Sequence, residues 1–256
     1  MNFLILLRVE LKKLRRSHII WILLVPLIIL WIPNILNSGM VMDGNAMGIA
    51  PENDFFIQAF LGLAWFMYPA TLVIGTVLLC QTERNNHGLL KMLSLPVSSV
   101  QLCLAKFMVL LLLAAVQLVL MDLMYFPCAI IASEMNHYQL LLSPSLVFQQ
   151  TGLLFLSSLP MAALYWMVAV LFTTPVFSIG IGLASIVPSV LIMNTDLWYC
   201  YPPCYPFFLL TVLQGEMSRS SDTFLWEWVP FLPVAAALFA VFLTLSCICF
   251  GRAERR

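Results

Sequence analysis

The residues of this chain that could do chemistry are few, and they lack the neighbours that catalysis needs. A phosphate-binding loop places glycines before a lysine, because the backbone N–H groups of the loop cradle the phosphates. None of the lysines follows such a pattern: Lys12, Lys13, Lys91 and Lys106. We therefore expect no ATP hydrolysis by this route in the chain itself.

Metal-dependent chemistry is no better supported. A zinc site built from His and Cys needs several ligands on one face, whereas His18, His87 and His137 fall in different predicted loops. No His-Glu-x-x-His pattern and no paired glutamates mark an intramembrane protease. We expect no enzyme, no cofactor held by this chain and no nucleic-acid partner.

Asp122 is the one acid that falls within a long apolar stretch. A carboxylate near the middle of a bilayer costs about 2.5 to 3.5 kcal/mol on insertion scales, so it should face a cavity or a polar partner. Gln117, five residues earlier, shares a helix face with it only loosely. Two interpretations stay open: a residue of the transport pathway, or a partly solvated acid near the outer membrane surface.

Cys200 and Cys204 flank the tripeptide Tyr201-Pro202-Pro203. Two cysteines at this spacing could form a disulfide across a diproline turn in an oxidising exterior. Unpaired thiols are equally compatible with the sequence. The disulfide is therefore a hypothesis with free thiols as its alternative.

The apolar composition of the chain indicates which kind of helix must hold these residues in place. Hydrophobic residues make up 62% of the 256 residues and charged residues only 9%, with a mean hydropathy of +0.99. These values are typical of a polytopic membrane protein. The apolar runs predict an all-α fold with six transmembrane helices, at about 19–36, 55–81, 102–131, 146–172, 176–194 and 228–250.

The basic residues orient these spans. Six spans place both termini on one side. Eleven of the twelve basic residues fall at the termini or in and beside the loop between the second and third spans, leaving Arg219 opposite. Cytoplasmic loops carry an excess of Lys and Arg. Both termini are therefore predicted to be cytoplasmic, in a multi-pass protein of the cell membrane, most simply a bacterial plasma membrane.

Residues 1–17 form a predicted amphipathic helix. Apolar residues recur at helical spacing at Phe3, Leu4, Leu7, Leu11 and Leu14. A basic amphipathic helix of this kind lies on the membrane surface, where it binds anionic lipids. Its basic residues are Arg8, Lys12, Lys13, Arg15 and Arg16.

Residues 83–97, ERNNHGLLKMLSLPV, form the interior loop with enough polar character to meet a soluble partner. We call them the coupling segment. In a short helix, Leu89, Leu90 and Leu93 would share one apolar face, and Pro96 would end that helix. An interfacial segment that only caps a membrane hairpin is the alternative. The link at residues 173–175 is too short for a second docking helix.

The coupling segment resembles a known family. Glu83, Leu89-Leu90, the run Leu93-Ser94-Leu95-Pro96-Val97-Ser98 and Lys106 entering the next span look like the first cytoplasmic loop of ATP-binding-cassette exporter permeases. More narrowly, they resemble the six-span permeases of lantibiotic immunity and bacitracin-type peptide resistance. The resemblance extends to the order of spans and loops over nearly all residues of the chain.

This resemblance implies partners and a mechanism. The coupling segment would dock on an ATPase subunit dimer that carries ATP and magnesium, and a second permease copy, identical or related, would complete the exporter. The cargo would be an amphipathic, lantibiotic-like peptide. Another amphipathic or lipid-linked cargo, an ion, or a sensor or scaffold without transport stays open. The coupling residues would be Glu83, Arg84, Leu89, Leu90, Leu93 and Pro96.

The stretch 196–227 between the fifth and sixth spans is dense in aromatic residues. Trp and Tyr collect at membrane interfaces, so an aromatic belt is the simpler interpretation. In the resembled family this position holds short re-entrant helices that line the exit. Residues 207–213 are apolar but too short to span a membrane, which suits that interpretation.

Overall fold

Apolar helices of membrane-spanning length dominate the architecture of the chain, in a computed structural model that describes residues 3–14, 19–43, 49–84, 98–172, 174–218 and 228–253. Within these ranges all regular structure is helical, as predicted. The elements are α1 (Phe3–Leu14), α2 (Ile19–Leu36), α3 (Ser38–Asp43), α4 (Pro51–Gly62), η2 (Leu63–Met67), α5 (Tyr68–Arg84), α7 (Ser99–Asn136), α8 (Pro144–Leu171), α9 (Pro175–Ala184), α10 (Ser189–Ile192), η3 (Trp198–Cys200), η4 (Pro202–Cys204), α11 (Tyr205–Ser218) and α12 (Trp228–Ala253).

Six segments of the described residues are long and apolar enough to cross a membrane, which confirms the predicted number. They are Ile19–Leu36, Pro51–Cys80, Ser99–Asn136, Pro144–Leu171, Pro175–Ile192 and Phe231–Phe250. The first has the predicted bounds. The third continues past residue 131, where a loop was expected, until His137 takes a left-handed conformation with φ of 53° and ends the helix.

The fifth span differs from prediction in being broken. α9 ends at Ala184 and α10 begins at Ser189, with Pro188 at its N-cap. Proline has no N–H to donate, so the backbone ladder of α9 cannot continue through this position. The second span contains a π-helical turn, η2, between α4 and α5.

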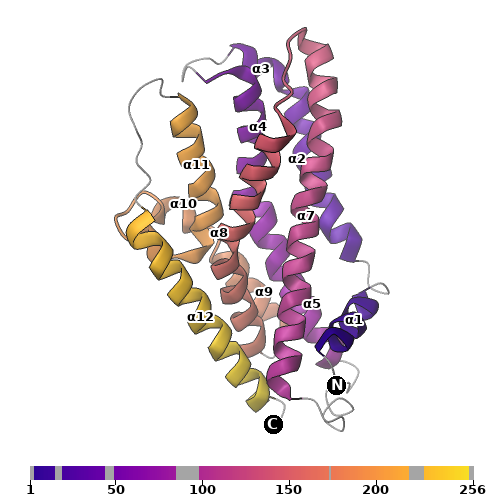
Figure 1. Cartoon of the computed structure of the whole chain (residues 1–256), viewed down its shortest axis with the longest axis vertical. Coiled ribbons are helices and arrows are strands. Elements are labelled where there is room, and N and C mark those ends of the chain that lie inside the picture. Colours follow the sequence, from indigo (N-terminus) through magenta and orange to yellow (C-terminus); the bar gives the residue numbers. More distant parts are fainter. Residues whose placement is uncertain are drawn as a thin grey trace.

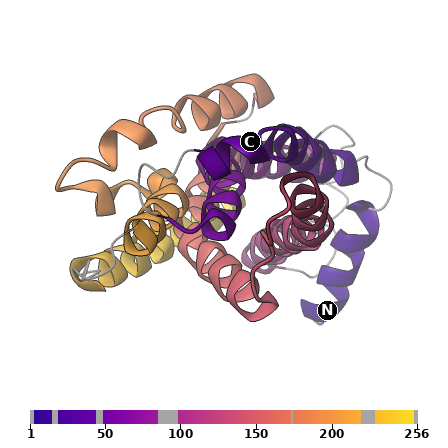
Figure 2. The same ribbon diagram turned by 90° about the horizontal axis from the view of Figure 1, so that it is seen from above.

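The bundle is organised around α7 and α8. In Figure 1 α7 runs the length of the molecule and the shorter α8 lies beside it, with α1 and the end of α12 at the same end of the bundle. Seen along the bundle in Figure 2, α9 and α10 lie on an outer flank. The largest buried side chains include Trp31, Phe55, Phe56 and Tyr125, which meet where α2, α4 and α7 pack together.

Candidate functional site

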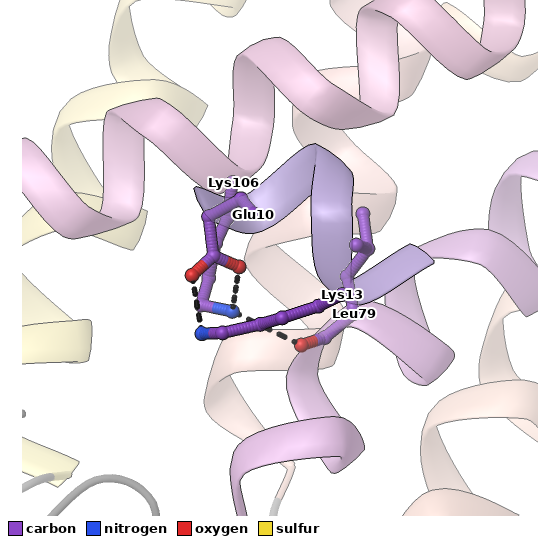
Figure 3. A network of polar contacts seen from close by, with 4 residues as sticks. All are labelled: Glu10, Lys13, Leu79 and Lys106. Carbon is purple, nitrogen blue, oxygen red and sulfur yellow. Dashed lines mark hydrogen bonds and ion pairs between the residues drawn. The ribbon is translucent and has the colours of Figure 1, made fainter. Parts of the chain in front are cut away.

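A buried ion pair attaches α1 to the bundle. Lys106 Nζ of α7 donates to Glu10 Oε2 at 2.9 Å, and the two side chains are 1% and 2% exposed. Lys13 Nζ donates to the other carboxylate oxygen at 2.5 Å. Lys106 also reaches the backbone carbonyl of Leu79 in α5, at 3.4 Å (Figure 3). Four polar groups from α1, α5 and α7 therefore form one network.

The charge of Glu10 is stabilised by its neighbours. Burial alone would raise the pKa of this carboxyl group, but the ammonium groups of Lys106 and Lys13 outweigh it and hold the pKa below its ordinary value. A buried carboxylate is tolerated only when it is paired and hydrogen-bonded. Both Oε atoms of Glu10 accept from an ammonium group, so this condition is met.

The network connects the two ends of the coupling segment. Leu79 lies in the last turns of α5, which ends at Arg84, and Lys106 lies in the second turn of α7, which begins at Ser99. The Ser98 hydroxyl accepts from the backbone N–H of Gln101 and caps α7. One lysine side chain thus ties together the helix that enters the coupling segment and the helix that leaves it.

The structure shows which face of α1 packs on the bundle, a point on which the apolar spacing made no prediction. Leu6 and Glu10 are buried, whereas Leu4 and Leu11 are exposed. Leu6 and Glu10 are four residues apart and share one face, because a helical turn takes 3.6 residues. The sequence reasoning missed Glu10; the signal that could have revealed it was a lone acid one turn after a leucine in a basic helix.

The remaining predicted residues of this end are placed only in part. Arg8 and Lys12 are exposed on α1, and Lys13 is half-buried. Glu83 and Arg84 form the last turn of α5. The other predicted residues lie outside the part of the chain that the structure describes: Arg15, Arg16, Leu89, Leu90, Leu93 and Pro96.

Hydrogen bonds between buried side chains of α5, α7 and α8 cross the interior of the bundle. Tyr68 Oη and Ser158 Oγ are 3.0 Å apart. Gln117 Nε2 donates to Thr71 Oγ1 at 3.1 Å, and Thr151 Oγ1 donates to Asp122 Oδ1 at 2.6 Å. The bonds join α5 to α8, α7 to α5 and α7 to α8. We call these six residues the polar seam.

Asp122 and Gln117 lie in the polar seam but face different helices. Asp122 is 1% exposed and Gln117 is fully buried, so the bundle keeps the carboxyl group away from solvent. Asp122 Oδ2 and Gln117 Oε1 have no hydrogen-bond partner among the described residues. A buried acceptor without a partner is costly, so both atoms are available to a group that enters the seam.

The predicted outer stretch forms an aromatic cluster. Trp198 stacks on Phe231 with ring centroids 5.2 Å apart, and Tyr205 meets Phe231 edge-on at 4.9 Å. Cys200 and Cys204 are free thiols in this structure, and Cys204 Sγ donates to the carbonyl of Trp198 at 3.3 Å. The disulfide between them stays a prediction.

The described residues include no group of three or more His, Cys, Asp and Glu side chains that could hold a metal ion. Among the described residues, the α1 network and the polar seam are two groups of buried polar side chains that join different helices. Paired charges and hydrogen bonds between helices can hold or transmit a movement between them. The arrangement suits a mechanical role of the membrane helices.

Comparison with known protein families identifies the family of this chain. The model of the ABC-2 family transporter protein matches residues 6–189. The chain belongs to the ABC-2 transporter family. The match runs from α1 to the first residue of α10 and includes the coupling segment and the polar seam. Comparisons with curated proteins and with solved structures gave no match.

This ABC-2 permease is a multi-pass protein of the cell membrane. The membrane domain of the family is a transport component, and membership implies association with an ABC ATPase. The α1 network therefore lies at the ends of the helices that bracket the predicted docking loop. The polar seam lies farther along the same helices.

Proposed function

We propose that this ABC-2 permease is the membrane half of an ATP-driven exporter in which the coupling segment receives the movement of a separate ATPase dimer. The observation that carries the proposal is the contact of Lys106 with Glu10 of α1 and with the Leu79 carbonyl of α5. A push on the coupling segment would reach α5 and α7 together, because their ends are joined through one buried side chain. ATP and magnesium would be held by the ATPase.

The movement would then cross the polar seam. Its hydrogen bonds link α5, α7 and α8, so a shift of one helix changes the partners of the others. Asp122 Oδ2 and Gln117 Oε1 would accept from polar groups of the cargo when these helices separate. In this proposal both residues belong to the transport pathway.

We infer that the cargo is an amphipathic, lantibiotic-like peptide, removed from the membrane as a means of immunity or resistance. The inference rests on the resemblance of the coupling segment and of the six-span plan to the lantibiotic-immunity and bacitracin-type permeases. A second permease, identical or related, would complete the pathway. The basic residues favour cytoplasmic termini and a bacterial plasma membrane.

A co-purification experiment tests the ATPase contact. The tagged permease is expressed with its candidate ATPase, and the double variant Leu89→Asp and Leu93→Asp is compared with the intact chain. Asn85→Asp with Asn86→Asp is the matched control, because it adds the same charge to the same segment without removing a leucine. Retention by the intact chain and the control, with loss from the leucine variant, supports the proposal.

Equal retention by all three chains would overturn the role of the leucine face. Absence of the ATPase from all of them would favour a membrane sensor or scaffold. The cargo is tested separately, by survival of cells that express the permease and ATPase in increasing concentrations of a lantibiotic. Protection that vanishes in the leucine variant supports a peptide cargo, and unchanged survival contradicts it.

A further inference from the structure

A cavity of about 150 Å³ opens between α8, α11 and α12. Its walls include Leu156 and Pro160 from α8, Leu209 from α11, and Phe231 and Ala235 from α12. The three helices are neighbours in both ribbon views (Figures 1 and 2). We call this cavity the lateral pocket, because it lies on the flank of the bundle and not at its centre.

The lateral pocket lies where two helices carry a proline. Pro160 is in the middle of α8 and lines the cavity, and Pro233 lies inside α12, between the lining residues Leu232 and Ala235. A proline inside a helix removes one backbone hydrogen bond and bends or widens the helix there. Pro160 therefore also leaves the carbonyl of Leu156 without its helical N–H partner at the wall of the pocket.

An occupant of the pocket would need no polar groups, because the side chains that line the pocket offer it no free hydrogen-bond partner. Its described lining is apolar except for Ser157, and that hydroxyl already donates to the Leu154 carbonyl of its own helix at 2.9 Å. An apolar cavity of this size excludes water and accepts an apolar molecule such as benzene. The occupant should therefore be a short piece of hydrocarbon.

The mouth of the pocket faces the surroundings of the bundle. Leu156 is 59% exposed and Leu232 is 53% exposed, and both line the cavity. They belong to helices that span the membrane. The medium against these two leucines is the hydrocarbon of the bilayer, so a lipid chain can enter sideways without crossing water.

The depth of the pocket selects which part of a lipid can enter it. Ser157 lies thirteen residues from Pro144 and fourteen from Leu171, the two ends of α8. At 1.5 Å per residue this is about 20 Å from either end, close to the midplane of a hydrocarbon core about 30 Å thick. A headgroup stays at the surface, and only the tip of its acyl chain reaches this depth.

We propose that the lateral pocket binds the terminal segment of a phospholipid acyl chain. The chain would fill the gap between α8 and α12 and contact Phe231, which is part of the aromatic cluster with Trp198 and Tyr205. The bound lipid would thus support the first turns of α12, where Phe231 and Ala235 line the pocket. This proposal does not depend on the cargo or on the ATPase.

Photolabelling of the full chain in phospholipid bilayers tests the proposal. One phospholipid carries a diazirine at the terminal carbon of an acyl chain, and a second carries it beside the glycerol. After irradiation, mass spectrometry locates the labelled residues. The terminal probe should concentrate its adducts on Leu156, Leu232 and Ala235, and the glycerol probe should leave these residues unlabelled.

Two variants make the result specific. Ala235→Phe fills the pocket and should lose the adducts on Leu156, whereas Ala237→Phe places the same ring on an exposed turn of α12 and should keep them. If Ala235→Phe fails to fold, Ala235→Leu fills less of the space and gives the same comparison. Equal labelling along all lipid-facing positions, or labelling unchanged by Ala235→Phe, would overturn the proposal.

Discussion

Glu10 and Lys106 are 96 residues apart in the sequence and form an ion pair with almost no exposure to solvent. The pair is asymmetric. Glu10 pairs with two cations, Lys106 and the 31% exposed Lys13, so loss of the acid breaks two ion pairs whereas loss of Lys106 leaves the pair with Lys13 in place. Removing the acid should therefore cost more than removing the lysine.

The first prediction uses this asymmetry. Glu10→Leu should lower the free energy of unfolding by about 3 to 5 kcal/mol, because it removes the carboxylate that pairs with the buried ammonium group of Lys106 and with Lys13. Lys106→Met should cost less, since Lys13 still neutralises Glu10. The double variant should recover most of the loss. Thermal unfolding of the purified protein measures all three, and equal losses in the two single variants would contradict the network.

The second prediction concerns pH. The pKa of Glu10 is lower in the folded protein than its ordinary value of 4.5, through Lys106 and Lys13 against the opposing effect of burial. The pair therefore stabilises the fold fully above about pH 4.5, and its contribution is lost as the pH falls through the folded pKa. The melting temperature of the intact chain should fall more steeply below that pH than that of Glu10→Gln. Parallel curves would remove Glu10 as the cause.

The first two predictions depend on residues that sequence patterns place poorly. Length and apolar composition were sufficient for six spans, because a helix needs about 20 apolar residues to cross a bilayer. The partner of Lys106 was not predictable, since helical spacing shows which residues share a face but not which face meets the bundle. In α1 the bundle takes the face of Leu6 and Glu10.

In the polar seam, too, the sequence revealed one residue of a pair but not its partner. Asp122 was recognised because a carboxyl group in an apolar span is expensive. Its partner Thr151 was not, because threonine is common in membrane helices and its pairing depends on how α7 and α8 are rotated. The break in the fifth span had a readable signal in Pro188, which the hydropathy of the surrounding residues concealed.

The third prediction tests the pathway role of Asp122. Asp122→Asn keeps the size of the side chain and an oxygen that can accept from Thr151, so expression and melting temperature should stay close to those of the intact chain. Transport should change, because the variant cannot carry a charge or a proton at this position. Survival of cells in the presence of the cargo measures the change. Unchanged survival with normal expression would make Asp122 a structural residue.

The fourth prediction concerns the close approach of α9 to α5. A Cβ added at Gly182 would lie 2.6 Å from a methyl group of Val73, whereas nothing lies within 4 Å of a Cβ added at Gly180. Gly182→Ala should therefore cost about 1 to 3 kcal/mol by overpacking. Gly180→Ala should be neutral or stabilise the helix by up to about 1 kcal/mol.

The partner of Gly182 supplies the decisive control for this fourth prediction. Combining Gly182→Ala with Val73→Ala removes the methyl groups that the new Cβ would meet, so the double variant should be more stable than the sum of its parts. Thermal unfolding of the four variants measures this coupling. Additive losses would mean that α9 moves away from α5 at little cost, and the broken fifth span would then be loosely held. A clear rescue would establish that the fifth span is fixed to the bundle through this contact.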